Sequence, residues 1–461
     1  MKISIRNAAA VLSAFGLVAL SGAAMATNGY FTHGVGTESK GMAGTGIGSN
    51  GANGPIIAAS NPALAVFASD SWEVGLSAFS PMRTYSVDGP GLQGQFGAFS
   101  LGAGSYDSSS EWFPIPYVAK NWQLSNGNAL AFAFYGRGGM NTDWDDSDIT
   151  AVLDPDGPGQ APILTMPGVF GGDHAGVDFS QAFLAINYAG KSGDNFAWGI
   201  GPVFAVQMFE AKGLGLFAGY TNTFAASGGT VFPENLTNNG HDTATGFGAA
   251  AGIWWAMGNA VSAGLSYQSE FSMSEFKDYS DLFAEDGGFD IPASIKFGIS
   301  FNGSNNARLN FDIEHTQFGD VASVGNPMAN IAGCPTAGLD GTDIESCLGG
   351  KNGAGFGWED MTTYKLGIEW TPSDTTIWRF GYSYGEQPVQ AADTLFNILA
   401  PGVMEQHFTF GMTKRNSDGG AWNFSLMYAP SNTVSGQNMF DPTQIIELKM
   451  KQVEFEVSYL W

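Results

Sequence analysis

The chain has 461 residues and a formal net charge of −25, yet only 13% of its residues are charged, 13% are aromatic and 65 are glycine. The acidic surplus excludes nucleic acid as a natural partner, because its phosphates would be repelled. So few charged residues are unusual for a soluble protein of this length, because its surface must be kept in water by them.

The first segment, residues 1–26, has the three parts of a secretory signal peptide. A positively charged start precedes an apolar run over residues 8–20, and Ala-Met-Ala at residues 24–26 forms a small-x-small cleavage site. The apolar run is too short to favour a retained membrane helix. We therefore expect the mature chain to begin at Thr27. Loss of the two basic residues of the signal leaves 16 basic and 43 acidic residues, a net charge of −27.

The next segment, residues 27–69, is rich in Gly, Ala, Ser and Asn and has neither helical nor strand periodicity. Such a composition usually belongs to a linker or a disordered tail. Because a long run of strands follows, we expect the segment to fill the space that those strands enclose, as an N-terminal hatch. Asn61, Pro62 and Ala63 favour a turn, because proline disfavours helical geometry at Asn61 and the asparagine side chain bonds nearby backbone. We expect this turn to lie against the enclosing wall.

From residue 70 onward the sequence alternates between apolar and polar residues, which is the pattern of half-buried strands. At the C-terminus one face carries Val453, Phe455, Val457, Tyr459 and Trp461, and the other carries Gln452, Glu454, Glu456 and Ser458. Further alternating segments cover residues 295–301, 308–314, 363–370, 378–384 and 422–428. A soluble β-sandwich alternates too. Here, however, aromatic residues gather near the segment ends, as they do at membrane interfaces.

The connections between these segments alternate strictly between short and long. Short connections are expected at residues 125–128, 191–194, 257–259, 303–305, 372–374 and 416–420. Long connections are expected at residues 87–110, 141–176, 211–245, 275–291, 319–360, 387–404 and 430–450. Six short turns and seven long loops join fourteen strands, and this asymmetry is typical of outer-membrane barrels. We predict an all-β fold, a 14-stranded antiparallel transmembrane β-barrel over residues 70–461. It would lie in the outer membrane of a Gram-negative bacterium, with both chain ends on the periplasmic side.

Two smaller features concern the last residue and the two cysteines. Trp461 is an aromatic final residue on an outward-facing strand, which fits the signal by which the barrel-assembly machinery recognises such proteins. Cys334 and Cys347 lie in one Gly-rich segment and are expected to form a disulfide in an oxidising compartment. Chain-entropy models value such a short loop closure at roughly 3 kcal/mol. The spacing of the cysteines does not indicate a metal site.

The long loop at residues 141–176 is strongly acidic. Its carboxylates include Asp143, Asp145, Asp146, Asp148, Asp154 and Asp156. Their spacing does not match a calcium-binding loop. Simple solvation and calcium binding therefore both stay open, and a related hypothesis is that divalent ions bridge this loop to lipopolysaccharide phosphates.

Several short motifs resemble those of one family of outer-membrane transporters. They are Thr27-Asn28-Gly29-Tyr30-Phe31, Gly41-Met42-Ala43-Gly44, Asn61-Pro62-Ala63, Tyr135-Gly136, Met140-Asn141-Thr142-Asp143, Gly246-Phe247-Gly248 and Tyr267-Gln268-Ser269-Glu270. On these residues the chain resembles the FadL and TodX family of transporters for long-chain fatty acids and hydrocarbons. The resemblance spans essentially the whole mature chain. It implies a hatch inside fourteen strands, capture between two extracellular loops and sideways release beside a kinked third strand. It also implies an inner pocket near Thr27, Asn28, Tyr30 and Phe31.

By the strand count, the capture loops implied by the resemblance are residues 211–245 and 275–291. Both contain apolar residues, which are a liability on an exposed loop unless they bind something. Packing against one another as a lid is the alternative, and both interpretations stay open. The residues expected to line the groove are Leu214, Leu216, Phe217, Phe224, Phe232, Leu282 and Phe283.

The third strand is expected at residues 129–139, with Tyr135, Gly136 and Gly138 near its outer end. Glycines inside a strand weaken pairing and mark bulges or bends. A kink there would open the wall laterally, as the resemblance implies. A simple strand end entering a loop is the alternative.

The choice of substrate depends on whether a cation can meet a carboxylate. The candidate anchors are Arg137, Lys212 and Lys277, with Lys351 as a fourth, but each is also compatible with a solvated surface role. Long-chain fatty acids are the first expectation. Neutral hydrocarbons, either alkanes or aromatics, are the alternative.

No sequence feature indicates an enzyme. None of the five histidines lies in a recognisable nucleophile motif, and no cofactor is expected. The main rival class is a general diffusion porin, whose polar lumen would give the same alternation but which has no need of a plugging segment. We therefore expect a monomeric, passive transporter of hydrophobic compounds, in contact with lipopolysaccharide and outer-membrane lipid.

Overall fold

The structure is a computed structural model of the chain. It describes residues 27–51, 54–92, 98–145, 152–153, 164–165, 167–172, 174–303, 306–417 and 419–461. The expected signal peptide lies outside the described residues, as do Asp146, Asp148, Asp154 and Asp156 of the acidic loop.

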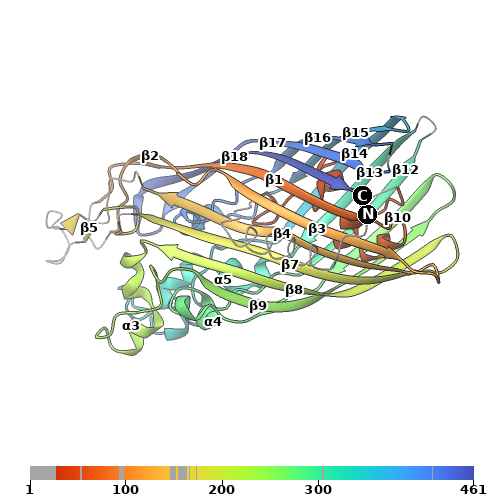
Figure 1. The fold of residues 1–461 in the computed structure, drawn as a ribbon. Coiled ribbons are helices and arrows are strands. Elements are labelled where there is room, and N and C mark those ends of the chain that lie inside the picture. Colours follow the sequence, from red (N-terminus) through yellow and green to blue (C-terminus); the bar gives the residue numbers. More distant parts are fainter. Residues whose placement is uncertain are drawn as a thin grey trace.

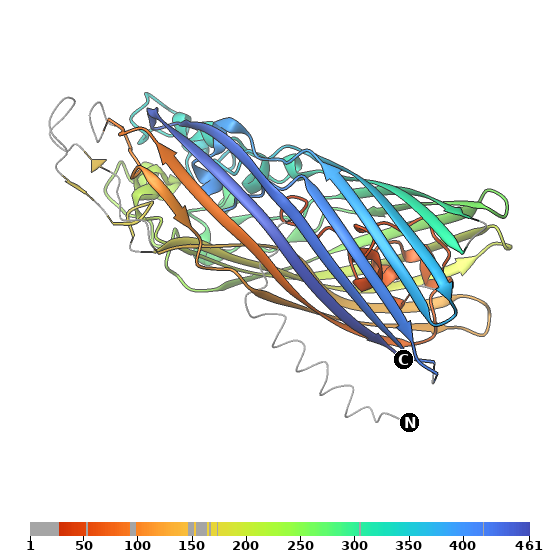
Figure 2. The same cartoon turned by 90° about the horizontal axis from the view of Figure 1, so that it is seen from above.

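Fourteen antiparallel strands close into one barrel, which confirms the predicted fold class (Figures 1 and 2). In chain order they are β1 (Trp72–Asp88), β3 (Phe113–Gln123), β4 (Ala129–Trp144), β7 (Ala175–Lys191), β8 (Phe196–Lys212), β9 (Asp242–Ala256), β10 (Val261–Gln268), β12 (Ser294–Asn302), β13 (Ala307–Thr316), β14 (Met361–Ser373), β15 (Thr376–Gly385), β16 (Gln406–Arg415), β17 (Ala421–Asn438) and β18 (Asp441–Leu460). Pairing of β18 with β1 closes the ring. The short strands β2 (Gly104–Asp107) and β11 (Ser272–Met273) pair with β1 and β9, and β5 (Val152–Leu153) forms a separate sheet with β6 (Leu164–Thr165).

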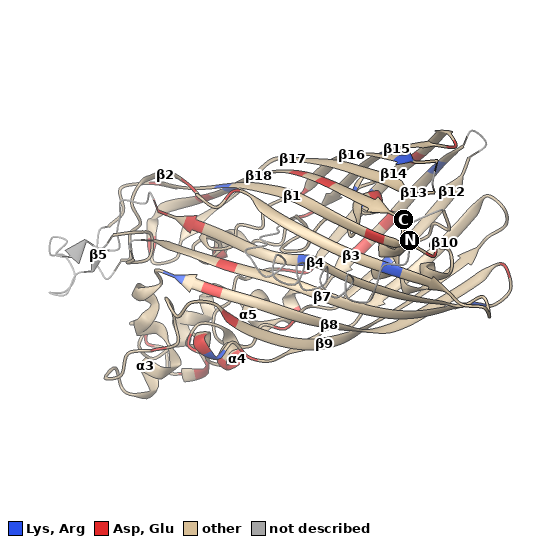
Figure 3. Cartoon of the chain, in the orientation of Figure 1, with Lys and Arg blue, Asp and Glu red and all other residues tan. Residues whose placement is uncertain are grey.

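The alternation in the sequence separates an apolar outer face from a polar interior. On β18 the Phe455 side chain is 48% exposed, whereas Glu454 and Glu456 are 3% and 1% exposed. On β14, Leu366 is exposed and the neighbouring Lys365 is buried. Figure 3 shows that the middle stretches of β8 and β9 carry no charged residue. Apolar residues outside and charges inside are the reverse of a soluble sandwich and the arrangement of a barrel in a bilayer.

The connections follow the predicted asymmetry with one exception. Short turns join β3 to β4, β7 to β8, β9 to β10, β12 to β13, β14 to β15 and β16 to β17, and the longer loops lie at the opposite end (Figure 1). The loops contain short helices: η4 (Gly215–Tyr220), α3 (Asn222–Ala226), η5 (Lys277–Tyr279), α4 (Ala284–Gly287), η6 (Phe318–Asp320), α5 (Ala322–Gly325), η7 (Met328–Gly333), η8 (Ile344–Ser346), η9 (Ala391–Asp393) and η10 (Phe396–Ile398). Within the described ranges, no helix is long and apolar enough to cross a membrane.

The exception is the long loop expected at residues 430–450, and that prediction is wrong. β17 and β18 remain paired through this stretch up to Asn438 and Asp441. The outward face changes here from apolar residues to residues such as Thr433 and Lys449, while Leu448 and Met450 face inward and are buried. The apolar pattern of a lipid-facing strand therefore disappears, although the strand continues. The third strand, β4, likewise runs to Trp144 and does not end at residue 139.

The hatch fills the lumen near the end of the barrel where the C-terminus lies (Figure 2). It contains α2 (Thr37–Lys40) and two 3₁₀ turns, η1 (Pro55–Ala59) and η2 (Pro62–Val66). Most of its described residues are buried, including those of η2. Their side chains pack against the inner face of the wall, so an unpatterned Gly-rich sequence becomes an ordered plug.

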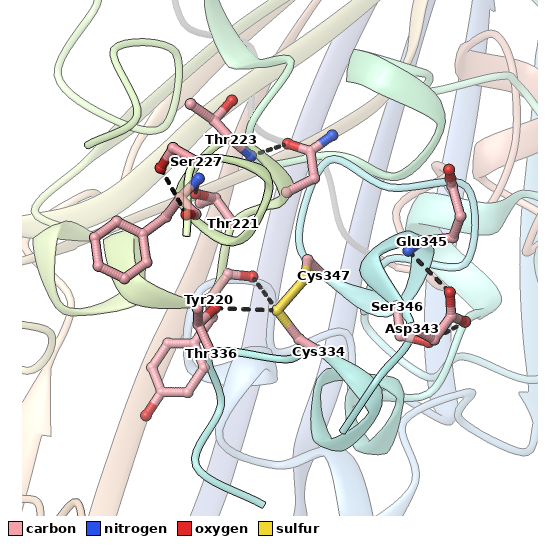
Figure 4. Close-up of a disulfide and its surroundings, with 12 residues drawn as sticks. Tyr220, Thr221, Thr223, Ser227, Cys334, Thr336, Asp343, Glu345, Ser346 and Cys347 are labelled. Atoms are coloured by element: carbon pink, nitrogen blue, oxygen red, sulfur yellow. Dashed lines mark hydrogen bonds between the residues drawn. A yellow bond between two sulfur atoms is a disulfide. The ribbon is translucent and has the colours of Figure 1, made fainter. Parts of the chain in front are cut away.

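The disulfide between Cys334 and Cys347 is formed, as predicted (Figure 4). It joins the two ends of a segment in the loop between β13 and β14. Both cysteines are buried, and the next residue, Leu348, donates its backbone N–H to the Tyr220 carbonyl at 2.9 Å. The disulfide therefore closes the part of this loop that is hydrogen-bonded to η4 of the loop between β8 and β9.

Candidate functional site

The barrel wall is interrupted between β3 and β4. Their pairing ends at Tyr117 and Tyr135, although β4 continues to pair with β7 on its other side. That second pairing shifts register between Gly136 and Gly138, which places a bulge at Arg137. β3 carries Pro114 and Pro116 at the same level, and each removes one N–H from the ladder.

Hatch residues occupy this interruption in the manner of a short extra strand. The Thr32 N–H donates to the Arg137 carbonyl at 2.8 Å, and the Gly139 N–H donates to the Tyr30 carbonyl at 3.0 Å. Phe31 and Gly138 face each other in the same pairing. The first residues of the hatch therefore satisfy backbone groups of β4 that β3 leaves unpaired.

The N-terminal residues of the hatch form a tight, buried turn. The Thr27 hydroxyl and the Asn28 N–H both donate to the Phe31 carbonyl, at 2.5 and 2.9 Å. Gly29 has a φ of +61°, and a Cβ there would lie 2.5 Å from the Phe318 ring. Only glycine fits both requirements. The four residues expected near an inner pocket thus lie together inside the barrel.

Aromatic side chains surround this turn. The centroid of the Tyr30 ring lies 4.7 Å from that of Phe31, and the rings of Phe179, Phe289, Phe318 and Trp358 lie between 5.1 and 6.1 Å away. Tyr30 is completely buried, and this burial raises the pKa of its hydroxyl well above the ordinary value. We call this group of six rings the aromatic chamber.

A cluster of cations lies beside the chamber. The Arg137 guanidinium is 4.3 Å from the centre of the Phe31 ring, and its Nη2 is 3.2 Å from Glu314 Oε1. Lys296 Nζ and Lys365 Nζ reach the same carboxylate at 2.9 and 2.6 Å. Three cations thus share one carboxylate. With the buried Asp312, which lies opposite Lys365 in the ladder, counted as well, the cluster retains one positive charge beside these aromatic rings.

The structure separates the candidate anchors proposed from the sequence. Arg137 lies at the chamber, whereas Lys212 is half exposed and pairs with Glu210 at 3.2 Å. Lys277 and Lys351 are exposed in the loops. Sequence reasoning missed Lys296 and Lys365, which lie in one cluster with Arg137. The strand alternation could have found them, because each lies between outward-facing apolar residues and so must point inward.

Ion pairs with the inner wall hold the middle of the hatch. Lys40 Nζ lies 2.5 Å from Glu454 Oε1 and 2.6 Å from Glu456 Oε2, and all three residues are buried. Burial opposes the charged form of Lys40, but the two carboxylates outweigh it and raise its pKa. Burial also lowers the pKa of the nearby His33 to about 4, so this imidazole is neutral at physiological pH. On the other side of α2, Glu38 Oε1 lies 3.6 Å from Arg379 Nη2.

Asn61 links the hatch turn to the wall. Its side-chain oxygen accepts the Ala63 N–H at 3.1 Å, and its Nδ2 donates to the Ile47 carbonyl at 2.9 Å and to the Ile253 carbonyl at 3.3 Å. The wall residue next to this turn is Gly252 on β9, and a Cβ atom at this position would collide with the Asn61 amide. Asn61, Pro62 and Ala63 therefore form a capped turn packed against β9.

An apolar pocket lies beneath the extracellular loops. Its cavity volume is about 40 Å³, and it is lined by Val177, Phe209, Leu214, Phe217, Leu282, Phe283, Ser323, Leu348, Ala354, Gly355, Phe356, Phe396 and Leu399. Four of the seven predicted groove residues are among these, but four loops contribute and not two. Leu216 packs against the core outside this lining, and the rings of Phe224 and Phe232 contact each other at a tilted angle with centroids 5.1 Å apart.

Two further sequence-based hypotheses concern a metal site and the acidic loop at residues 141–176. The described part of the chain contains no group of three or more His, Cys, Asp or Glu residues placed to hold a metal ion. Asp143 lies 3.6 Å from the exposed His174 ring, and most of the acidic loop lies outside the described residues.

Comparisons with known proteins show the fold. No protein-family model matches the chain, and no curated protein matches it in sequence. Among solved structures, the toluene transporter TodX of P. putida is similar with a TM-score of 0.61 and 16% identity, over 93% of this chain and 98% of that one. A FadL homologue of Pseudomonas aeruginosa gives a TM-score of 0.59 and 15% identity, over 94% and 99%. The toluene transporter TbuX of Ralstonia pickettii gives a TM-score of 0.52 and 12% identity, over 92% and 98%. The predicted resemblance is therefore confirmed for the fold.

Proposed function

We propose that this chain is a passive outer-membrane transporter of hydrophobic compounds. A substrate enters the pocket beneath the loops, passes to the aromatic chamber and leaves sideways between β3 and β4. The observation that carries this proposal is the interruption in the wall, which hatch residues fill and which lies beside the chamber. A water-filled path for polar solutes would need neither a plug nor a break in the wall.

The comparisons and the surface of the barrel support this proposal. The similar structures are described as transporters or channels for toluene and other monoaromatic hydrocarbons, and as a FadL homologue. The apolar outer face fits a bilayer. The signal peptide expected from the sequence of residues 1–26 and the outward-facing aromatic residues of β18 fit export and insertion by the barrel-assembly machinery into a membrane that contains lipopolysaccharide.

The driving force is the burial of apolar substrate surface. Removing one methylene group from water contributes about 0.8 kcal/mol. The chamber and the loop pocket both offer aromatic and aliphatic walls to receive it. No covalent step and no cofactor enter this mechanism.

Long-chain fatty acids are the proposed substrates. Arg137, Lys296 and Lys365 exceed the charge of Glu314, so the cluster can attract a carboxylate while the alkyl chain lies in the chamber. Neutral hydrocarbons are the second candidate. The observation that favours them is that Glu314 and the Phe31 ring already engage Arg137.

Uptake by whole cells tests the function and separates the two substrates. The host is a Gram-negative strain without its own fatty-acid transporter, and the substrates are a radiolabelled long-chain fatty acid and an alkane of equal length. We expect Arg137→Gln to reduce uptake of the acid about tenfold and leave the alkane unchanged, with Lys212→Gln as the matched control. Equal uptake of the acid by Arg137→Gln and the parent would favour neutral hydrocarbons. Uptake of neither compound above that of cells without the protein would refute the function.

A further inference from the structure

Two buried glutamines point into the lumen from neighbouring strands. Gln181 on β7 and Gln207 on β8 face each other across the ladder and are 2% and 0% exposed. Among the described residues, neither side-chain amide has a hydrogen bond of good geometry, although the Tyr30 hydroxyl lies within reach of Gln181. An unpaired buried amide costs free energy comparable to a lost hydrogen bond. The two amides lie side by side, and the described part of the chain leaves that of Gln207 without any partner.

The residues around them are apolar or small. On the inner face of β7, Gln181 lies between Phe179 and Phe183, both completely buried. The flanking strands present small residues at the same level, with Gly138 opposite Gln181 and Ala244 opposite Gln207. A Cβ at Gly138 would lie 1.8 Å from the Gln181 Oε1 atom, so this amide lies directly over the bulge of β4.

The two amides also lie on the proposed path. Val177 and Phe209, which line the loop pocket, precede Gln181 and follow Gln207 on the inner faces of the same two strands. Two residues along a strand span about 7 Å. Gln207 is therefore the next inward-facing residue below Phe209 on β8. Gln181 is the second inward-facing residue below Val177 on β7, and it lies next to the wall interruption. A substrate that travels from the pocket to the interruption passes both.

We propose that Gln181 and Gln207 form a neutral polar subsite that binds the hydroxyl group of an uncharged hydrophobic compound, such as an alkylphenol or a long-chain alcohol. This inference rests on the proposed function. An amide both donates and accepts a hydrogen bond, and a hydroxyl group does the same. A carboxylate suits the site less well, because neither glutamine carries a charge to offset its desolvation. The nearby Arg137 cluster is the site for an anion.

Gln268 supports the distinction between these two subsites. Its Oε1 accepts from Arg137 Nη1 at 2.8 Å, while its Nε2 has no partner in the described structure. The side-chain oxygen of Gln268 is thus already hydrogen-bonded to the Arg137 guanidinium. In the described ranges of the chain, Gln181 and Gln207 form no hydrogen bond with a charged group, so their chemistry is that of a neutral site.

Equilibrium binding to the full-length mature protein in lipid nanodiscs tests the inference. The probes are 4-octylphenol and octylbenzene, which differ by one hydroxyl group, and empty nanodiscs give the partition background. After subtraction of the partition background, we expect the protein to bind the phenol about tenfold more tightly than octylbenzene. This difference is the contribution of about one hydrogen bond. The double variant Gln181→Met and Gln207→Met should lose this preference and still bind octylbenzene. Gln437→Met, on the exposed extension of β17, is the control.

The outcomes separate failure of the inference from failure of the function. An unchanged ratio of phenol to octylbenzene binding in the double variant would overturn the inference. Equal loss of binding of both probes would also overturn it, provided that heat-dependent gel mobility shows the barrel to be folded. Binding of octylbenzene by the parent without any preference for the phenol overturns only the inference. Binding of neither probe by the parent would count against the proposed function itself. If the double variant does not fold, the single Gln207→Met variant is compared in the same way.

Discussion

Lys40→Met should release the hatch from the inner wall. The Lys40 ammonium is buried between Glu454 and Glu456, at 2.5 and 2.6 Å. Removing one partner from a buried ion pair typically costs about 3–5 kcal/mol, because the remaining charge is left without compensation. Here two carboxylates would be left. A loss of this size raises the population of undocked hatch on the order of a hundredfold or more.

Two measurements on the purified protein check this expectation. Limited proteolysis should cut Lys40→Met within residues 27–71 much faster than the parent, and planar bilayers should show new ionic conductance. Lys120→Met is the matched control. Lys120 pairs with Asp70 at 2.5 Å, but the Asp70 side chain is 50% exposed, and such a pair contributes about 0.2–1 kcal/mol. If Lys40→Met is as resistant to protease and as non-conducting as Lys120→Met, the ion pairs do not hold the hatch. A large steady conductance in the parent would falsify the plugged barrel.

Three further predictions concern the exit, the turn and pH. Gly136→Trp places bulk at the wall interruption and should lower uptake at least tenfold with the barrel still folded. Phe132→Trp on the same strand should not, and normal uptake in Gly136→Trp would contradict lateral exit. Asn61→Ala removes three hydrogen bonds of about 1 kcal/mol each, so uptake should fall at an unchanged protein level on immunoblots. The pKa of His33, about 4 when docked, lies below the ordinary 6.5, so the contribution of His33 to docking is complete above pH 6.5. This contribution falls by roughly 3 kcal/mol as pH falls to 4. Proteolysis between pH 4 and 8 should show this trend, and His33→Gln should flatten it.

The barrel could be predicted from the sequence because the bilayer imposes one rule on every strand. Wherever a strand faces lipid, its outer residues are apolar and its inner residues are free to be polar, as at Phe455 and Glu454. The rule fails where a strand leaves the bilayer. Residues 430–450 were therefore mistaken for a loop, although their backbone pairing continues.

The site was harder to predict because its parts meet from distant places in the chain. Lys40 and its partner Glu454 are separated by 414 residues, and no pattern in either segment points to the other. The glycines around Arg137 did indicate a bulge, since a strand with several glycines pairs weakly. The sequence could not show that hatch residues would fill the interruption, because the hatch has no periodicity that fixes its register.

The two ends of the hatch are held by different interactions, which bears on how a substrate could open the wall. At η2, Ala63, Leu64 and Ala65 are completely buried, and Phe67 packs on Trp254 with ring centroids 4.6 Å apart. Near β4, two backbone hydrogen bonds and aromatic contacts hold the first residues.

A ligand in the aromatic chamber competes with the Tyr30 and Phe31 rings for the same apolar walls, but it displaces nothing at η2. Two hydrogen bonds contribute about 1–3 kcal/mol together. Burial of the two rings contributes about 3–6 kcal/mol, and each buried methylene of a ligand about 0.8 kcal/mol. An alkyl chain longer than about eleven methylenes therefore gains enough to free the first residues while η2 stays docked. Hydrogen exchange should show this as loss of protection at Thr32 and Gly139 that increases with ligand chain length. Equal protection with short and long ligands would contradict the competition.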